Sequence, residues 1–178
     1  MSDCPDCGGV TTRVRPTDRQ AGLPVRLRAG DELAPLSGFV CEDCGRIRFT
    51  TNIDSGGGRG CSACGGPIAG GRLRSPEGEL AVVDDETGRT TRLSATACAD
   101  CGAVELRTDG LDGSGGGSCP VCDSGLRRSY PQLGEGETGR GVRFSVVGAE
   151  DAPDRTDPVA WSCTGCGLVL LYDRATGG

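Results

Sequence analysis

The cysteines of this chain constrain its possible folds more than any other feature. There are 12 of them in 178 residues, and each belongs to a pair with the spacing C-x-x-C. Six pairs divide into three four-thiolate sites, the usual ligand set of structural zinc. A disulfide framework rarely places every cysteine at one local spacing, so the pattern predicts three zinc ions, one per site. The pairs are Cys4/Cys7, Cys41/Cys44, Cys61/Cys64, Cys98/Cys101, Cys119/Cys122 and Cys163/Cys166.

The pairs also repeat along the chain. First pairs begin at residues 4, 61 and 119, and second pairs begin at residues 41, 98 and 163. Each second pair is followed by glycine, which a tight turn with positive φ favours, and then by apolar residues at alternate positions, as in a β-strand. Glycine-rich runs at 55–60 and 113–118 resemble flexible linkers. The sequence therefore predicts three tandem domains at 1–54, 61–112 and 119–178.

A second pairing of the cysteines is also compatible with metal spacing. Cys44 and Cys61, and likewise Cys101 and Cys119, lie close enough in sequence for sites that span the glycine-rich runs. That arrangement leaves Cys4/Cys7 to join Cys163/Cys166 across the whole chain. Loop-closure entropy and the phase of the repeat both favour pairing within each unit.

Composition predicts that metal, rather than a large core, stabilises the fold. The chain contains 32 glycines and 10 prolines, but only one tryptophan, two tyrosines and three phenylalanines. Such a glycine-rich and aromatic-poor chain buries little apolar surface. Zinc bound only by the folded state contributes on the order of 10–16 kcal/mol of apparent binding energy per site.

The motifs resemble one known family. Cys4-Pro-Asp-Cys-Gly8 and Cys119-Pro-Val-Cys122, each answered by a C-x-x-C-Gly sequence, look like the small CPxCG-related zinc-finger proteins of prokaryotes. The resemblance covers the chain as three copies. It implies three tandem zinc ribbons, each a three-stranded antiparallel sheet with two zinc knuckles, in a small metal-stabilised all-β protein. Two positions depart from the family: the pair at Cys61 lacks proline, and Asp123 replaces the glycine after Cys122.

Redox and other enzymatic activities find less support in the residues. A thioredoxin-like C-x-x-C pair needs a βαβ setting, and no helical periodicity is visible. The chain contains no histidine, the commonest general base, and 12 thiolates in closed sites leave no open zinc position. The N-terminus has neither a basic region nor an apolar run, and no stretch is long enough to span a membrane. We therefore expect a cytoplasmic protein that is not an enzyme and has neither a membrane nor a small-molecule substrate as partner.

Charge gives a mixed indication of the partner. The formal net charge is −6, and three zinc-tetrathiolate sites bring it to about −12, a sign that disfavours generic nucleic-acid binding. In the first unit, however, arginine alternates with apolar or small residues in three segments. If these are strands, their arginines share one outward face and are candidate phosphate contacts; a solvated strand face is the alternative. The candidates are Arg13, Arg15, Arg26, Arg28, Arg46 and Arg48.

The third unit differs from the others after its last cysteine. Its strand is apolar on both faces, because its outward positions carry Leu168, Leu170 and Tyr172. The equivalent positions carry Arg46, Arg48 and Thr50 in the first unit and Ala103, Glu105 and Arg107 in the second. A strand of this kind is normally covered on both sides. With Trp161 on the adjoining strand, these residues are a candidate interface, either with a neighbouring unit or with a partner chain.

Taken together, these features predict a zinc-binding adaptor that contacts protein, nucleic acid or both. Two other classes stay open: a thiol redox or chaperone protein that uses its C-x-x-C pairs, and a structural subunit of a larger assembly.

Overall fold

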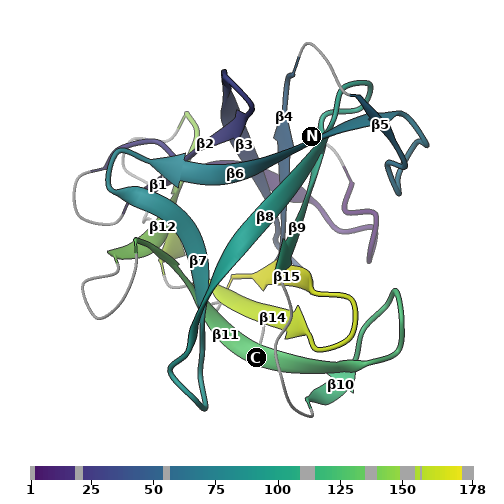
Figure 1. Ribbon diagram of the computed structural model, residues 1–178, viewed down its shortest axis with the longest axis vertical. Coiled ribbons are helices and arrows are strands. Elements are labelled where there is room, and N and C mark those ends of the chain that lie inside the picture. The colour runs from purple at the N-terminus through teal and green to yellow at the C-terminus, as the bar shows by residue number, and fades with distance from the viewer. Residues whose placement is uncertain are drawn as a thin grey trace.

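The computed structural model is an all-β protein, which confirms the predicted class. It describes residues 3–18, 22–53, 57–108, 115–134, 140–148, 155–156 and 158–173. All regular structure in these ranges is β-strand (Figure 1). Within them, no helix is long and apolar enough to cross a membrane.

Each repeat unit supplies four main strands, one more than the three predicted for a ribbon. In unit 1 these are β1 (Thr11–Asp18), β2 (Arg26–Ala29), β3 (Glu32–Cys41) and β4 (Arg46–Thr51). In unit 2 they are β6 (Pro67–Ser75), β7 (Gly78–Asp84), β8 (Thr90–Cys98) and β9 (Ala103–Thr108). In unit 3 they are β11 (Gly125–Leu133), β12 (Arg140–Val146), β14 (Val159–Cys163) and β15 (Leu168–Tyr172).

Three short strands complete the sheet, and two of them fall in the predicted linkers. These are β5 (Gly58–Arg59), β10 (Gly116–Ser118) and β13 (Arg155–Thr156). β5 pairs with β6, and β10 pairs with β11. The C-terminal ends of both glycine-rich runs are therefore paired backbone rather than free linker, whereas residues 54–56 and 109–114 lie outside the described ranges.

The last strands of the three units pair with one another in a cycle. β4 pairs with β9, β9 with β15, and β15 with β4, all antiparallel. An equivalent backbone hydrogen bond recurs at each step. The donor is the N–H of the last residue of one strand or of the residue after it, and the acceptor is the carbonyl of the glycine that precedes the next strand. The bonds run from Thr51 to Gly102 (2.9 Å), from Thr108 to Gly167 (2.8 Å) and from Asp173 to Gly45 (2.8 Å).

A second set of pairings joins the units at their first two strands. β2 of unit 1 pairs with β6 of unit 2, β7 pairs with β11 of unit 3, and β12 pairs with β1. We call these the 1/2, 2/3 and 3/1 seams. Because both cycles close after three steps, the chain forms one ring with pseudo-threefold symmetry instead of three separate sheets (Figure 1).

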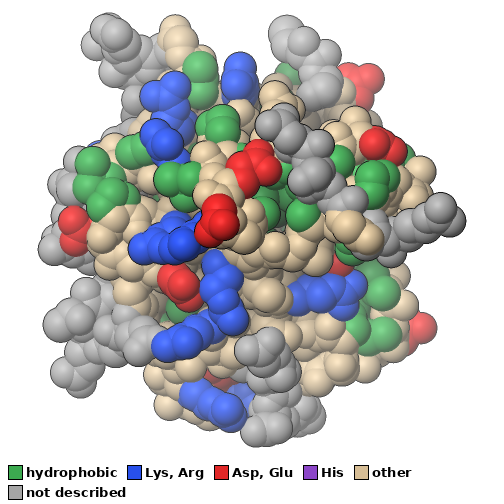
Figure 2. All heavy atoms as spheres, turned by 45° about the horizontal axis from the view of Figure 1, so that its top comes forward, with side chains coloured by type: hydrophobic (Ala, Val, Ile, Leu, Met, Phe, Trp, Pro, Cys, Tyr) green, Lys and Arg blue, Asp and Glu red, His purple; other side chains and the backbone are tan. Residues whose placement is uncertain are grey.

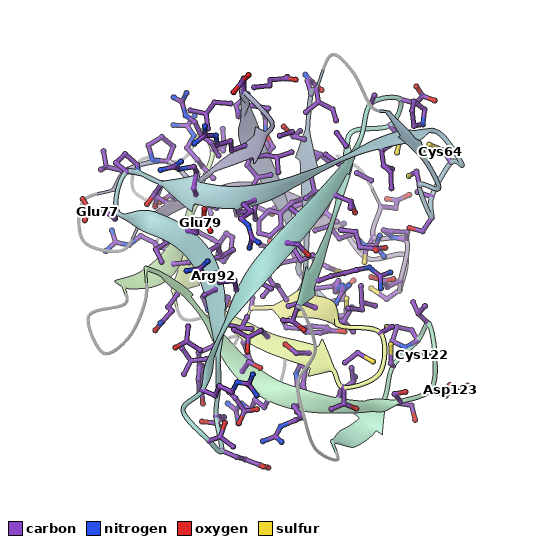
Figure 3. All side chains as sticks on the ribbon, viewed as in Figure 1. Cys64, Glu77, Glu79, Arg92, Cys122 and Asp123 are labelled. Atoms are coloured by element: carbon purple, nitrogen blue, oxygen red, sulfur yellow. The ribbon has the colours of Figure 1, made fainter. Side chains whose placement is uncertain are left out.

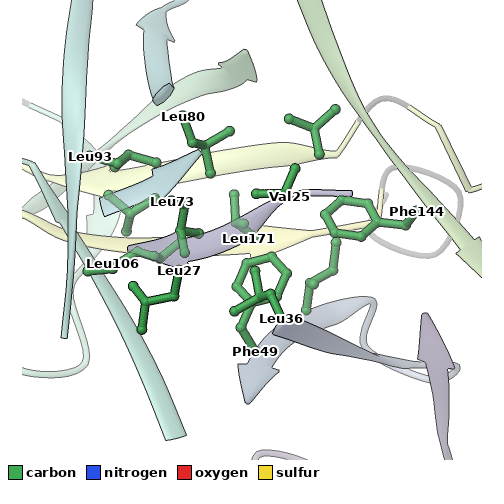
Figure 4. Packing of buried hydrophobic residues seen from close by; sticks show 14 of the residues in the cluster. Val25, Leu27, Leu36, Phe49, Leu73, Leu80, Leu93, Leu106, Phe144 and Leu171 are labelled. Atoms are coloured by element: carbon green, nitrogen blue, oxygen red, sulfur yellow. The ribbon is translucent and has the colours of Figure 1, made fainter. Parts of the chain in front are cut away.

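The ring encloses a core larger than the composition predicts. One buried cluster draws side chains from all three units, among them Phe49, Leu73 and Phe144 (Figure 4). Phe49 and Phe144 come from different units, and their rings stack with centroids 6.0 Å apart. Each unit has few apolar residues, but those of all three units pack into one shared core. Hydrophobic burial therefore stabilises the fold together with the cysteine sites.

A buried ion pair also links units 2 and 3. The Arg127 Nε on β11 lies 2.8 Å from the Asp84 Oδ2 at the end of β7, and the side chains are only 10% and 2% exposed. A second Arg127 nitrogen donates to the Asp84 Oδ1 at 2.8 Å, and the backbone N–H and the hydroxyl of Thr87 donate to the same oxygen. Burial acts to raise the pKa of Asp84, but these bonds outweigh it and lower the pKa below its usual value.

The ring geometry predicts unequal costs for two glycine-to-alanine substitutions. Gly65 and Gly102 both have positive φ, +74° and +71°, so alanine at either adds strain of about 1–2 kcal/mol. A Cβ at Gly65 meets nothing within 4 Å, whereas one at Gly102 lies 2.6 Å from the Thr51 carbonyl oxygen of the neighbouring unit. We expect Gly102→Ala to destabilise the protein by about 1–3 kcal/mol more than Gly65→Ala in chemical denaturation. Equal losses would contradict the β4–β9 contact.

Candidate metal centres

The six C-x-x-C pairs adopt one shared turn. In each, the residue after the second cysteine has positive φ, and its N–H donates to the carbonyl of the first cysteine at 2.7–3.2 Å. Five of these residues are glycines, and the sixth is Asp123, with φ of 58°. The departure at Asp123 therefore leaves the turn intact (Figure 3). The six residues are Gly8, Gly45, Gly65, Gly102, Asp123 and Gly167.

The structure brings the pairs together within each unit, as the repeat predicts. In each unit the four Sγ atoms lie within 4.8 Å of one another. The first pair stands before the unit's first long strand and the second pair joins its last two strands, so folding of the unit assembles each cluster. The tetrads are Cys4/Cys7/Cys41/Cys44, Cys61/Cys64/Cys98/Cys101 and Cys119/Cys122/Cys163/Cys166.

The sulfur spacing fits a tetrahedral metal ion. Contacts across each tetrad measure 3.9 and 3.4 Å in unit 1, 3.6 and 3.5 Å in unit 2, and 3.7 and 3.5 Å in unit 3. Four sulfurs at about 2.3 Å from a central ion stand about 3.8 Å apart. None of the 12 cysteines forms a disulfide. Each tetrad can therefore hold one metal ion.

Backbone donors around the sulfurs favour the thiolate form that a metal requires. The N–H of Cys44 lowers the pKa of Cys41 to about 7, and the side chain and N–H of Ser124 lower that of Cys122 to about 6. Burial instead raises the pKa of Cys44 to about 12 and that of Cys166 to about 11. A bound cation would provide the charge that keeps these last thiols deprotonated.

Two polar residues that sequence reasoning missed brace the metal turns. Asp6, inside the first turn of unit 1, lies 2.6 Å from Arg48 and 3.8 Å from Arg46. Arg107 of unit 2 donates at 2.8 Å to the carbonyl of Cys166 in unit 3. Nothing local in the sequence signals the Arg107 contact, because it depends on the pairing of β9 with β15.

The six candidate arginines occupy three places. Five are exposed, as expected for the outward face of alternating strands, but the Arg46 side chain is only 16% exposed. Its guanidinium stands over the ring of Tyr172 in unit 3, 5.2 Å from the centroid. Arg26 and Arg28 lie at the 1/2 seam, Arg13 and Arg15 lie on β1, and Arg46 and Arg48 lie on β4. Their role in binding nucleic acid stays a prediction.

The apolar strand of unit 3 is covered within the chain. Leu168 and Leu170 are 7% and 5% exposed, and they pack in one cluster with Trp161, Tyr172 and three cysteines of the third tetrad. Both leucines also line a cavity of about 520 Å³ at β4, β9 and β15, which Arg46 and Arg48 of unit 1 line as well. These contacts account for the burial of the strand, and a partner-binding role for it stays a prediction.

Comparison with known proteins yields no relative. No protein-family model matches the chain, and no curated protein or solved structure matches it significantly. The resemblance to CPxCG-related proteins therefore rests on the motifs themselves.

Proposed function

We propose that this chain is a zinc protein in which three tetrathiolate sites hold a ring-shaped scaffold together, and that the scaffold is a non-enzymatic adaptor. The observation that carries the proposal is the closed geometry of the three tetrads. Tetrahedral sites with four sulfur ligands suit zinc, and four-coordinate sites of this kind are structural because no position is left for substrate.

The proposed partner is a macromolecule, either protein or nucleic acid, and not a membrane or a small-molecule substrate. In the ring, the metal turns and the outward strand faces of all three units include exposed residues. Sites that hold chain segments together contribute to binding by fixing these faces relative to one another.

Mild oxidation tests this proposal against a thiol redox role. We expect the folded protein to retain its zinc under concentrations of peroxide that oxidise a free cysteine peptide, and to show no turnover in a disulfide-reduction assay. Zinc release with formation of disulfides, reversed by a thiol reductant and accompanied by turnover, would favour the redox class. Zinc is measured with a colorimetric chelator, and thiols are counted by alkylation and mass spectrometry.

A further inference from the structure

Four arginines face one another across the 1/2 seam. In the register of β2 and β6, Arg26 lies opposite Arg74, and Arg28 lies opposite Arg72. Between them, Leu27 and Leu73 also lie opposite each other and are 0% and 1% exposed. Because side chains alternate across a strand, this buried leucine pair fixes all four arginines on the outward face. We call these four residues the seam arginines.

The pseudo-threefold symmetry shows what the scaffold itself requires at these positions. Equivalent residues are defined by register, because Thr11, Ile68 and Leu126 each lie opposite the first cysteine of the second pair. At the 2/3 seam the equivalent pairs are Tyr130 with Val83 and Gln132 with Ala81. At the 3/1 seam they are Arg15 with Ser145 and Thr17 with Arg143. Neither seam places two arginines opposite each other, so the fold does not need the seam arginines.

The seam arginines also act against stability. Like charges directly opposite on neighbouring strands repel each other. Among the described residues, the carboxylate near the group is that of Glu79, which lies opposite Arg74 on β7, is 3.8 Å from Arg72 and belongs to a side chain that is 43% exposed. Arg28 and Arg72 also donate to the backbone carbonyls of Gly30 (3.2 Å) and Leu93 (3.4 Å). Neither Arg26 nor Arg74 forms an ion pair with another described residue. Figure 2 shows several basic side chains on the face in view, with acidic side chains interspersed among them.

We infer that the seam arginines bind the phosphate backbone of double-stranded nucleic acid. Arginine presents a planar fork of donors that matches phosphate oxygens. Proteins that bind single strands stack bases on aromatic side chains, whereas the residues that flank Arg26 and Arg28 on β3 are Pro35 and Leu33. The net negative charge of the chain is screened beyond about 10 Å at 0.1 M salt, so the local cluster decides the contact. This inference rests on the proposed function and names the partner class.

Salt-dependent binding of a labelled 20-base-pair DNA duplex tests the inference. Four phosphate contacts predict that log K falls with log salt with a slope of about −3.6. In Arg72→Gln/Arg74→Gln we expect the slope to weaken by about 1.8 and affinity to fall at least tenfold at low salt. Arg26→Gln/Arg28→Gln should match that loss. Zinc content should be unchanged. The melting temperature should be unchanged or higher, because the substitutions relieve repulsion between the arginines.

The matched control is Arg89→Gln/Arg128→Gln, which removes the same charge from two exposed residues outside the seam. An equal loss in this control would overturn the inference, because it would show binding through overall charge. Absence of wild-type binding at low salt would also overturn it, as would equal competition by polyglutamate, which would indicate an acidic protein partner. Absence of bound zinc from the purified protein would instead contradict the proposed function. The two failures are therefore distinguishable.

Discussion

Removal of zinc by a strong chelator is expected to unfold all three units together. Each proposed site contributes on the order of 10–16 kcal/mol of apparent binding energy, whereas a typical domain has a net stability of about 5–15 kcal/mol. Units 1, 2 and 3 share paired strands at both ends of every repeat. We therefore expect the β-sheet signal in circular dichroism to fall in one transition as zinc is released.

Disruption of one metal site distinguishes a closed ring from a chain of three independent domains. Replacement of Cys41 and Cys44 by serine is expected to destabilise the two intact sites, because β2 and β4 pair with strands of the other units. A fragment of residues 61–118 should fold poorly alone for the same reason. Full zinc binding at the two remaining sites, with unchanged chelator resistance, would contradict the shared ring.

Replacement of Arg127 by methionine is expected to cost about 3–5 kcal/mol of unfolding free energy. The substitution leaves the buried Asp84 carboxylate without its cationic partner, and breaking a buried pair on one side has a penalty of this size. Because the pair links β7 to β11, the loss should appear as a lower denaturation midpoint for the whole protein. The measurement is denaturant unfolding of zinc-loaded protein.

Arg128→Met is the matched control, since Arg128 is the exposed neighbour of Arg127, and such surface substitutions usually change stability by less than about 0.5 kcal/mol. The double variant Asp84→Asn/Arg127→Met should lose less than the sum of its single variants, because it removes the uncompensated charge. Additive losses would show that the two side chains do not interact.

The metal sites were predictable from sequence because their geometry is local. A cysteine pair and the residue after it form one turn, and the phase of the repeat was enough to match first pairs with second pairs. Asp123 shows the limit of this reasoning: an aspartate at a glycine position still adopts positive φ of 58°, since acidic and amide side chains tolerate that region better than most.

The ring itself was not predictable from the same information. Alternating apolar residues identify a strand and its buried face, but they do not name the neighbouring strand. The sequence placed Tyr172 at a candidate interface with a neighbouring unit or a partner chain, but it did not identify Arg46 of unit 1 as the residue that Tyr172 contacts. Of the seam arginines, Arg26 and Arg28 were identified from the sequence, and Arg72 and Arg74 were not. The segment Arg72-Leu-Arg74 repeats the pattern of Arg26-Leu-Arg28, but only the pairing of β2 with β6 brings the two segments together.

Native mass spectrometry of the freshly purified chain, under non-reducing conditions, tests the central claim most directly. It weighs the intact protein with its bound metal, and a parallel denatured spectrum counts free thiols. We predict a single species that carries three zinc ions, and 12 reduced cysteines once zinc is removed. A metal-free chain with six disulfides, or a folded chain with a different number or kind of metal ions, would contradict the account.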